Sequence, residues 1–600
     1  MKNNVITILV DSVFSGCIGK NRTNASSTPF IDSLVSDSLV SKNVYSYGPY
    51  TDAATKGLYC GNKTLDDYGY YFGINSSDYN HYRVFKENNY ETVGIYYPYY
   101  LISSKTHQYI DHSIYNSGFI FGSVWFGKLK HYSTRKKSGE LSEIDYRVIE
   151  KFMVMLFDCW ILFYSDVKDG RSRYIVDRIK DHSFDGFEIL KKEKKIFEDD
   201  PKSYIDSVLE SGMNHTLAKI NDYDSDKIVL RDFVKKEFKK YRKFHRQIQR
   251  IELRNNIKDT TKVLKLLIQS LSNDDRDGLG IRLFENWIMS MFGNFFVKYS
   301  SGKKMWQTEA SMMNQLYAAL DFIDHRDPSD ERPFYISIHA EEPHNRLAYF
   351  TYDLPDEELV EEEISYLQTL VDNVGEDFKG HLIYQLSLGY IDLCVKRLFS
   401  ELNKRGLLTN TTIMLTADHG SSYSLNPLRK SMVNNFFVEN YRTPLLIWNS
   451  DTSQPWKKHY LGKYQGENVF PTLCDIIGIK KPDLWIGKSI LDNPDGIEYV
   501  ITEYMGPGCP DMINRDVWMS VQNNKYIVAI RAKINCTIDK TDIVEIYDVE
   551  SDPYQLVNLV KRDYDKSEVL SLLRILGDRL DEISSSSNSI ISNINTFRVI

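Results

Sequence analysis

The tripeptide Asp418-His419-Gly420 combines residue types that bind metal ions, and it closely follows the β-branched, apolar run Thr411 to Thr416. Such a run predicts a buried parallel strand, and open α/β sheets bind their ligands beyond the carboxyl ends of such strands. The alternative is a capping aspartate followed by a turn glycine, which the three residues alone leave open. The metal-site interpretation therefore depends on partners elsewhere in the chain.

Asp11 occupies the same kind of position as Asp418. The apolar run Val5 to Val10 predicts the first strand of the chain, and it ends at Asp11-Ser12. A carboxylate thus stands for a second time at the carboxyl end of a strand, where a ligand of the sheet would bind.

Thr51 is a candidate nucleophile. Residues Gly48 to Lys56 predict a loop that runs into a helix of small residues. A hydroxyl at such a helix start suits nucleophilic attack, because the exposed N–H groups and the helix dipole stabilise the anionic group that is attacked. The alternative is that Thr51 or Asp52 only caps the helix.

Two histidines follow a further predicted strand. The run Pro333 to Ile338 ends at His339, and His344 comes shortly after it. A single histidine at a strand end is usually structural, whereas two so close together make a functional role equally plausible.

The elements that must position these residues alternate between strands and helices. Further strands are predicted at Val40 to Tyr47 and Thr92 to Tyr96, and helices at Ser311 to Asp324 and Leu382 to Leu402. This alternation is typical of an α/β fold with a mostly parallel sheet. From Glu140 to about Phe296 the chain is rich in Lys and Glu with apolar residues at helical spacing, which predicts a helical insertion.

Composition excludes several classes of protein. With 42% hydrophobic and 26% charged residues in 600, the chain is globular rather than disordered or fibrous. Its net charge of −8 gives no support for a nucleic-acid partner. The seven cysteines include no CxxC pair, which argues against a disulfide framework and a structural zinc site. No signal sequence or membrane span is recognisable, so we expect a soluble, cytoplasmic protein.

Taken in order, these pieces resemble the sulfatase-like branch of the alkaline phosphatase superfamily. The matching segments are Ile6 to Ser12, Thr28 to Asp32, Asn43 to Ser46, Pro343-His344, Gly389 to Asp392, Asn410 to Gly420, Arg442 to Ile447, Asn468 to Leu473 and Ile546 to Pro553. The resemblance implies an α/β, alkaline-phosphatase-like sandwich whose central, mostly parallel sheet is flanked by helices. We expect this α/β domain at residues 1–135 and 301–495, a helical insertion at 136–300, and a small antiparallel C-terminal subdomain at 496–600.

The resemblance also implies one divalent metal ion, which could be Mn, Zn, Ca or Mg, and no organic cofactor. Its ligands would be Asp11, Thr51, Asp418 and His419. Thr51 would act as the nucleophile, while the metal lowers the pKa of its hydroxyl and screens the charge of the attacked group. His339 and His344 are candidates for binding the ester or protonating its leaving oxygen.

The sequence departs from the main sulfatase pattern around the nucleophile. Sulfatases of the main type carry there a cysteine that is converted to an aldehyde hydrate, whereas this chain has Thr51. The proline and the arginine that the family places two and four residues later are also absent, although Lys56 could supply the lost positive charge. Ser12 stands in place of a second acid, and two sulfate-binding cations near Gly94 are missing. These features resemble the phosphotransferase and phosphodiesterase members, such as lipoteichoic acid synthases.

The leading hypothesis is therefore a metal-dependent hydrolase or transferase that cleaves a phosphate mono- or diester of a small molecule or glycan through Thr51. The second hypothesis is a sulfate-ester hydrolase that works without the modified cysteine. A third, of another class, is a catalytically inactive relic of the fold that serves binding. The sequence leaves the alcohol side of the ester and the oligomeric state open.

Overall fold

The computed structural model describes residues 3–18, 26–66, 79–96, 104–115, 132–169, 172–174, 185–220, 312–340, 382–421, 436–505, 516–533, 542–553 and 557–593, with a few single residues and pairs between these stretches. The candidate histidine His344 lies outside the described residues. Within these stretches, no helix combines the length and the apolarity that crossing a bilayer requires.

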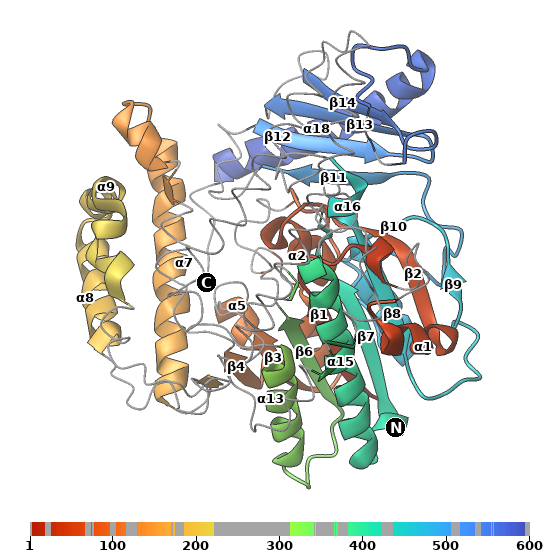
Figure 1. Ribbon diagram of the computed structural model, residues 1–600. Coiled ribbons are helices and arrows are strands. Elements are labelled where there is room, and N and C mark those ends of the chain that lie inside the picture. The colour runs from red at the N-terminus through yellow and green to blue at the C-terminus, as the bar shows by residue number, and fades with distance from the viewer. Residues whose placement is uncertain are drawn as a thin grey trace.

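A ten-stranded sheet forms the centre of the described chain (Figure 1). Its strand order is β10-β2-β8-β7-β1-β6-β3-β4-β5, and β9 also pairs with β2. The strands are Asn4–Val10 (β1), Ser38–Tyr45 (β2), Glu91–Tyr96 (β3), His112–Tyr115 (β4), Ser172–Tyr174 (β5), Phe334–Ala340 (β6), Thr411–Ala417 (β7), Arg442–Trp448 (β8), His459–Tyr460 (β9) and Tyr464–Gln465 (β10).

Strand β1 lies in the middle of this sheet, between β6 and β7. It runs parallel to both, and Val10 is level with Ala340 on one side and with Ala417 on the other. Only β8 is antiparallel to its neighbours β2 and β7, so the sheet is mostly parallel, as the sequence predicts. The register brings the residues that follow β1 and β7 to the same edge of the sheet.

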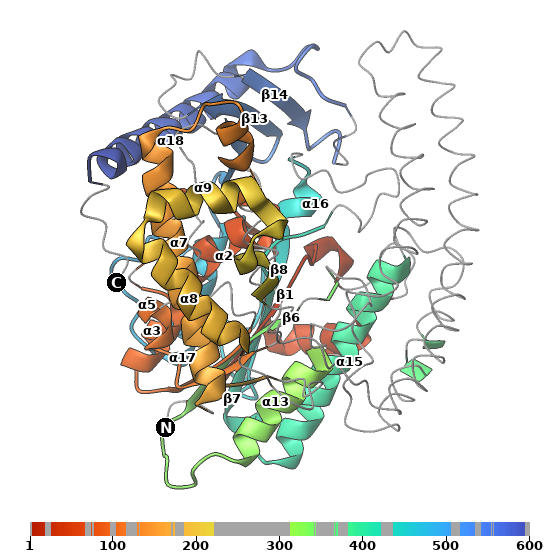
Figure 2. The ribbon, with the colours of Figure 1, turned by 90° about the vertical axis from the view of Figure 1, so that its left-hand side faces the viewer.

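Helices cover both faces of the sheet, because side chains alternate between the two sides along each strand. Val5 and Leu9 of β1 pack into one core, and Ile6, Ile8 and Val10 pack into the other. The second core contains α1 (Pro29–Leu34), α13 (Met312–Asp324) and α15 (Leu382–Lys404), and the first contains α2 (Thr51–Cys60), α3 (His81–Glu87) and α17 (Val469–Ile477). Figure 2 shows α13 and α15 on one side of the strands and α3 and α17 on the other. The α/β fold class expected from the sequence is thus confirmed.

The expected insertion at 136–300 is mainly helical where it is described. Its helices are α7 (Glu143–Lys168), α8 (Asp185–Asp199) and α9 (Pro201–Ser211), which pack beside the sheet on the side of α2 and α3. One strand, β5, also lies within it and extends the main sheet by pairing with β4, which the sequence analysis did not foresee. Residues 221–311 lie outside the described part of the chain.

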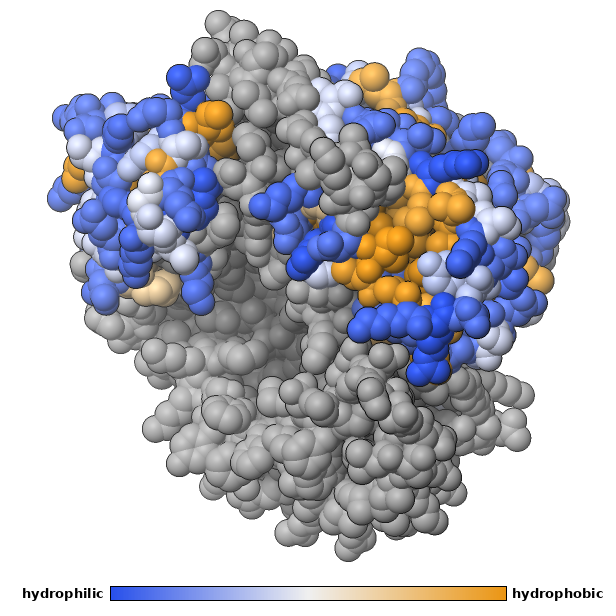
Figure 3. All heavy atoms as spheres, turned by 90° about the horizontal axis from the view of Figure 1, so that it is seen from above, coloured by the Kyte–Doolittle hydropathy of each residue, from blue (hydrophilic) through white to orange (hydrophobic). Residues whose placement is uncertain are grey.

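The C-terminal region forms a second, smaller sheet, which lies uppermost in Figure 1. It is an antiparallel meander of β11 (Val500–Tyr504), β12 (Asp516–Gln522), β13 (Tyr526–Lys533) and β14 (Asp542–Asp548), covered by the long helix α18 (Lys566–Asn593). Helix α18 turns its apolar stripe to this sheet with helical spacing, through Val569, Leu572, Leu576, Leu580 and Ile583. On the face seen from above, the described residues are mostly polar, with a large apolar patch and some smaller ones among them (Figure 3). The small antiparallel subdomain agrees with the expected fold class.

Candidate metal centre and nucleophile

Three candidate ligands meet where the central strands end. Asp11 directly follows β1, Asp418 directly follows β7, and His339 is the penultimate residue of β6. Each of the three offers one ligand atom, and these atoms all lie within 4.8 Å of one another. All three side chains are buried, so water contributes little to screening the two carboxylates from each other.

His419 adds a fourth donor to this group. Its Nδ1 lies 2.7 Å from the carbonyl oxygen of Gly420, which can only accept, so Nδ1 carries the proton and Nε2 presents a lone pair. That Nε2 faces Asp11 Oδ1 at 3.4 Å and Asp418 Oδ2 at 3.7 Å. Three electron-rich atoms thus converge, an arrangement that a cation between them stabilises.

The electrostatic surroundings of Asp418 also favour a bound cation. Burial raises the pKa of its carboxyl, and the neighbouring charge of Asp11 raises this pKa further, against the opposing effects of His419, His339 and the nearby hydroxyl of Thr51. Among the described residues, Asp418 Oδ2 has no hydrogen-bond partner. A buried carboxylate oxygen without a partner is costly, and a bound metal ion would remove that cost. The donors present therefore fit a divalent metal ion.

The structure places Thr51 beside these carboxylates. It is the first residue of α2, it is buried, and its Oγ1 donates a hydrogen bond of 3.1 Å to Asp11 Oδ2. The chain enters the helix through a close turn, in which a Cβ on Gly48 would lie 2.2 Å from the Cβ of Ala53. A left-handed Gly61 with φ of 63° ends the helix. The hydroxyl thus lies at the N-terminus of a ten-residue helix, where negative charge is favoured.

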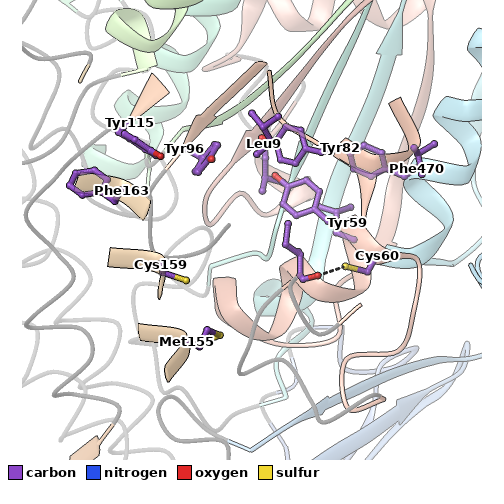
Figure 4. Close-up of a cluster of buried hydrophobic side chains, with 14 of the residues drawn as sticks. Leu9, Tyr59, Cys60, Tyr82, Tyr96, Tyr115, Met155, Cys159, Phe163 and Phe470 are labelled. Carbon is purple, nitrogen blue, oxygen red and sulfur yellow. Dashed lines mark hydrogen bonds between the residues drawn. The ribbon is translucent and has the colours of Figure 1, made fainter. Parts of the chain in front are cut away.

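Helix α2 is fixed by its buried face. Figure 4 shows the Tyr59 ring of α2 pointing toward Leu9 of β1 and Tyr82 of α3, with Phe470 of α17 close by. The ring centroids of Tyr59 and Phe470 are 5.6 Å apart. These contacts hold the helix, and with it Thr51, against the strand that leads to Asp11.

Ser12 connects the members of the site. Its N–H donates to Asp418 Oδ1 at 3.1 Å, and its Oγ donates to Asp11 Oδ1 at 2.6 Å. The residue has a φ of 65°, which is uncommon for a residue other than glycine and is found where surrounding contacts impose it. Tyr384 of α15 imposes it here, because its hydroxyl donates to the carbonyl of Ser12 at 2.8 Å and accepts from Phe14 N at 3.1 Å. From the sequence, Ser12 was interpreted only as the residue that stands in place of a second acid.

Gly420 is required by a close approach rather than by a turn. Its N–H donates to the carbonyl of Asn440 at 2.9 Å, and a Cβ at this position would lie 2.0 Å from the carbonyl oxygen of Glu439. Any side chain would therefore push the Asp418-His419 segment away from the neighbouring strand connection. The turn-glycine alternative of the sequence analysis is replaced by this steric reason.

Three further residues, Lys56, His339 and His344, were predicted to take part in catalysis. Lys56 is fully buried, and its Nζ donates to the backbone carbonyl of Asp66, in the loop that follows α2. Its role in catalysis stays a prediction, as does that of His344. His339, predicted to bind the ester or to protonate its leaving oxygen, lies with Asp11 and Asp418 in a group that could hold a metal ion, and its catalytic role stays a prediction.

Comparisons with known proteins bear on this site. Residues 230–479 match the family model of the sulfatases. An arylsulfatase of Clostridium perfringens is 25% identical over 288 residues, which are 44% of this chain and 56% of that protein. A choline-sulfatase of Rhizobium meliloti is 23% identical over 232 residues, which are 38% of this chain and 39% of that protein. The matches thus span about half the length of these relatives or less.

Among solved structures, the chain is similar to the phosphonate monoester hydrolase of Agrobacterium radiobacter. The TM-score is 0.45 at 12% identity, covering 97% of this chain and 96% of the other.

Proposed function

We propose that this chain, which is similar to the sulfatases of the alkaline phosphatase superfamily, is a metal-dependent hydrolase or transferase of phosphate esters with Thr51 as its nucleophile. The observation that carries the proposal is the hydrogen bond of 3.1 Å from Thr51 Oγ1 to Asp11 Oδ2. It joins a hydroxyl at a helix start to a carboxylate of the candidate metal centre.

Asp11, Asp418, His419 and His339 would hold the metal ion. When bound, a divalent ion there supplies Lewis-acid stabilisation to the attacked group and lowers the pKa of a nearby hydroxyl. His339 lies among the carboxylates, which favours its role as a ligand over that of an acid for the leaving group. Thr51 Oγ1 lies at the same centre and is therefore placed to react there.

The chain's own residues account for the first step. Thr51 Oγ1 gives its proton to Asp11 Oδ2, its hydrogen-bond acceptor, and attacks the phosphorus atom of the substrate. The new Oγ–P bond forms as the ester P–O bond breaks, and the departing alkoxide takes up a proton from water, to which Asp11 Oδ2 in turn gives the proton that it received. The N-terminus of α2 stabilises the phosphoryl oxygens during this exchange.

A second step returns Thr51 to its starting state. Water attacks the phosphorus of the phosphothreonine, the Oγ–P bond breaks, and Thr51 Oγ1 regains the proton that the attacking water loses, which leaves the phosphoryl group as free phosphate or a phosphate monoester. If an alcohol takes the place of water, the same step transfers the phosphoryl group, so hydrolase and transferase activity share one intermediate.

The residue at position 51 supports phosphate over sulfate. An aldehyde hydrate can expel a covalently bound sulfate by re-forming its carbonyl group, whereas a threonine ester must be cleaved by attack on its central atom. A phosphothreonine beside a divalent ion is open to such attack by water. The names of the two relatives favour the second candidate, a sulfate ester, and this alternative is part of the test below.

The test compares turnover of para-nitrophenyl phosphate, bis-para-nitrophenyl phosphate and para-nitrophenyl sulfate, with added Mn²⁺ or Zn²⁺. We expect a phosphate ester to be the best substrate and Thr51→Ala to abolish its turnover. Thr51→Ser keeps a hydroxyl and serves as the matched control, with partial activity. Intact-mass analysis of the quenched wild-type enzyme should show the gain of one phosphoryl group, which Thr51→Ala lacks. Dominant sulfate turnover that survives in Thr51→Ala would overturn the proposal.

A further inference from the structure

Gln555 follows the C-terminal segment Ile546 to Pro553 in the chain, and its buried side chain reaches outside the C-terminal subdomain. Its Oε1 accepts from Val438 N at 2.7 Å, and its Nε2 donates to the carbonyl of Phe436 at 2.9 Å. One amide thus satisfies a donor and an acceptor of the same backbone segment, residues 436–441. A carboxylate could make only the first of these bonds, because it has no proton to donate.

The backbone of Gln555 is held in an uncommon conformation. Its φ is 50°, which residues other than glycine seldom adopt and which surrounding contacts must impose. Its N–H donates to the carbonyl of Asp552 at 2.9 Å, and Val557 N donates to Asp552 Oδ2 at 2.8 Å. This turn fixes the direction of the Gln555 side chain, and with it the position of the amide at segment 436–441.

Segment 436–441 supports the turn that carries His419. It contains the short helix α16 (Val438–Tyr441), which lies between the C-terminal sheet and the central strands in Figure 1. The carbonyl of Asn440 accepts from Gly420 N at 2.9 Å, and the carbonyl of Gly420 in turn lies 2.7 Å from His419 Nδ1. A displacement of this segment would therefore move the imidazole of His419 within the candidate metal centre.

The C-terminal subdomain also contacts the helix that carries the candidate nucleophile. Tyr504 of β11 is fully buried, and its ring centroid lies 6.0 Å from that of Tyr50 and 5.7 Å from that of Phe436. Tyr50 is the N-cap residue of α2. The subdomain thus packs against the start of the nucleophile helix and against the segment that supports His419.

We propose that Gln555 is a positioning residue of the active site, which fixes the place of His419 through segment 436–441. The C-terminal subdomain then completes the site instead of only flanking it. The proposal rests on the proposed function, because it presupposes that the site at His419 cleaves an ester.

Asn558 provides a matched comparison within the same subdomain. Its amide also accepts from one backbone N–H and donates to one carbonyl, those of Ile546 and Val544, at 3.1 Å each. Both partners belong to β14, so the loss of these bonds would weaken the subdomain without releasing segment 436–441. Gln555→Met and Asn558→Leu remove the two amides while they keep most of the side-chain volume.

The first measurement is hydrogen–deuterium exchange of the full chain, read by mass spectrometry on peptides that contain Gly420. Gln555→Met should speed exchange of the Gly420 amide about tenfold, because the segment that carries its acceptor is no longer held. Asn558→Leu should keep the wild-type rate. Gln555→Glu keeps only the bond from Val438 N and should show a smaller increase. Unchanged exchange in Gln555→Met, or in Gln555→Glu if the first variant does not fold, would overturn the proposal.

The second measurement is steady-state kinetics with the para-nitrophenyl ester that wild type turns over best. Gln555→Met should lower kcat about tenfold and leave KM within about twofold, because a misplaced His419 weakens stabilisation of the transition state more than it weakens substrate binding. Asn558→Leu should change neither constant at a temperature at which it is folded. Thermal unfolding of each variant establishes that temperature.

The outcomes separate this proposal from the proposed function. Faster exchange at Gly420 with an unchanged kcat would make the contact of Gln555 structural only and would overturn the positioning role. An equal fall of kcat in Asn558→Leu would also overturn it, because a general loss of stability would explain both variants. A wild type that turns over no ester would overturn the proposed function, while exchange at Gly420 would still show whether Gln555 holds the turn.

Discussion

Buried carboxylates in two regions of this fold differ in the charge of their nearest partners. In the C-terminal subdomain, Glu503 is fully buried and faces the guanidinium of Arg579, with Nε–Oε2 and Nη2–Oε1 distances of 2.7 and 2.8 Å. Its Oε1 also accepts from Leu65 N at 2.8 Å. At the end of the main sheet, Asp11 and Asp418 face each other and the lone pair of His419.

The partners of a buried carboxylate distinguish a structural role from a functional one. Glu503 is buried together with its counter-ion Arg579, and it links α18 to the loop after α2. Its charge is therefore neutralised without a cation from solution. Asp418 is buried beside a like charge, and this raises its pKa in addition to the effect of burial. Burial is the same in both places, and only the partners distinguish them.

The largest expected effect is the loss of turnover when Asp418 is replaced. Asp418→Asn keeps an oxygen for the N–H groups of Ser12 and His419 but removes a metal ligand, so turnover should fall about 1,000-fold or more. Stability without metal should not fall, because the repulsion from Asp11 is removed. Steady-state kinetics and chemical denaturation measure both effects. A variant that is strongly destabilised without metal would show that Asp418 is structural.

Replacement of Arg579, the partner of Glu503, should instead lower stability and leave metal binding unchanged. Arg579→Met leaves Glu503 buried without a counter-ion, and we expect a loss of about 3–5 kcal/mol in the free energy of unfolding. Lys63→Met breaks the exposed ion pair with Glu582 and serves as the control, with a loss of about 1 kcal/mol or less. Metal affinity, measured on the folded variants, should stay at the wild-type value. A weakened metal site in Arg579→Met would mean that the two groups are coupled.

Metal binding should itself stabilise the protein. An ion that binds only the folded state, at a concentration about 100 times its dissociation constant, adds about 2.7 kcal/mol to the free energy of unfolding. Denaturation of the chelator-treated wild type with and without Mn²⁺ should show this gain, and Asp418→Asn should not. An equal gain in the variant would place the ion elsewhere.

Asp392 is an intermediate case, because hydrogen bonds rather than ions satisfy it. Its carboxylate accepts from the N–H groups of Phe30 and Ile31 at the start of α1 and from the hydroxyl of Tyr366. Burial raises its pKa to about 6, against the opposing effect of these hydrogen bonds. The folded protein therefore keeps a proton that the unfolded chain releases above its ordinary pKa of 3.8.

The free energy of unfolding should therefore fall as the pH rises from about 4 to 6, by about 2 kcal/mol from this group. Asp392→Asn does not titrate, so the difference in stability between wild type and variant should shrink over the same window. Denaturation at a series of pH values measures it. A difference that is independent of pH would show that the carboxyl has its ordinary pKa.

The sheet and the candidate ligands at its strand ends could be predicted from the sequence, because apolar runs and strand-end residues are local signals. Asp11, Thr51, Asp418 and His419 were singled out in this way, and the structure brings them together. The position of β5 was missed, because a strand of three residues within helical sequence has no period of its own.

The finer geometry of the site depends on contacts that sequence patterns do not show. The φ of Ser12 is held by Tyr384, which lies 372 residues further along the chain. His339 joins the ligand group because β6 pairs with β1, a register that no local pattern specifies. Arg579 and Glu503 are 76 residues apart in the sequence, and their contact is likewise not specified by any local pattern.

The central claim is that Asp11 and Asp418 hold a divalent ion, and anomalous diffraction from crystals soaked in Mn²⁺ or Zn²⁺ tests it most directly. We expect one strong anomalous peak about 2.0–2.3 Å from oxygens of Asp11 and Asp418 and from His419 Nε2. Crystals of Asp418→Asn should lack that peak. A wild-type map with no peak between these residues, at an ion concentration that supports turnover, would contradict the account.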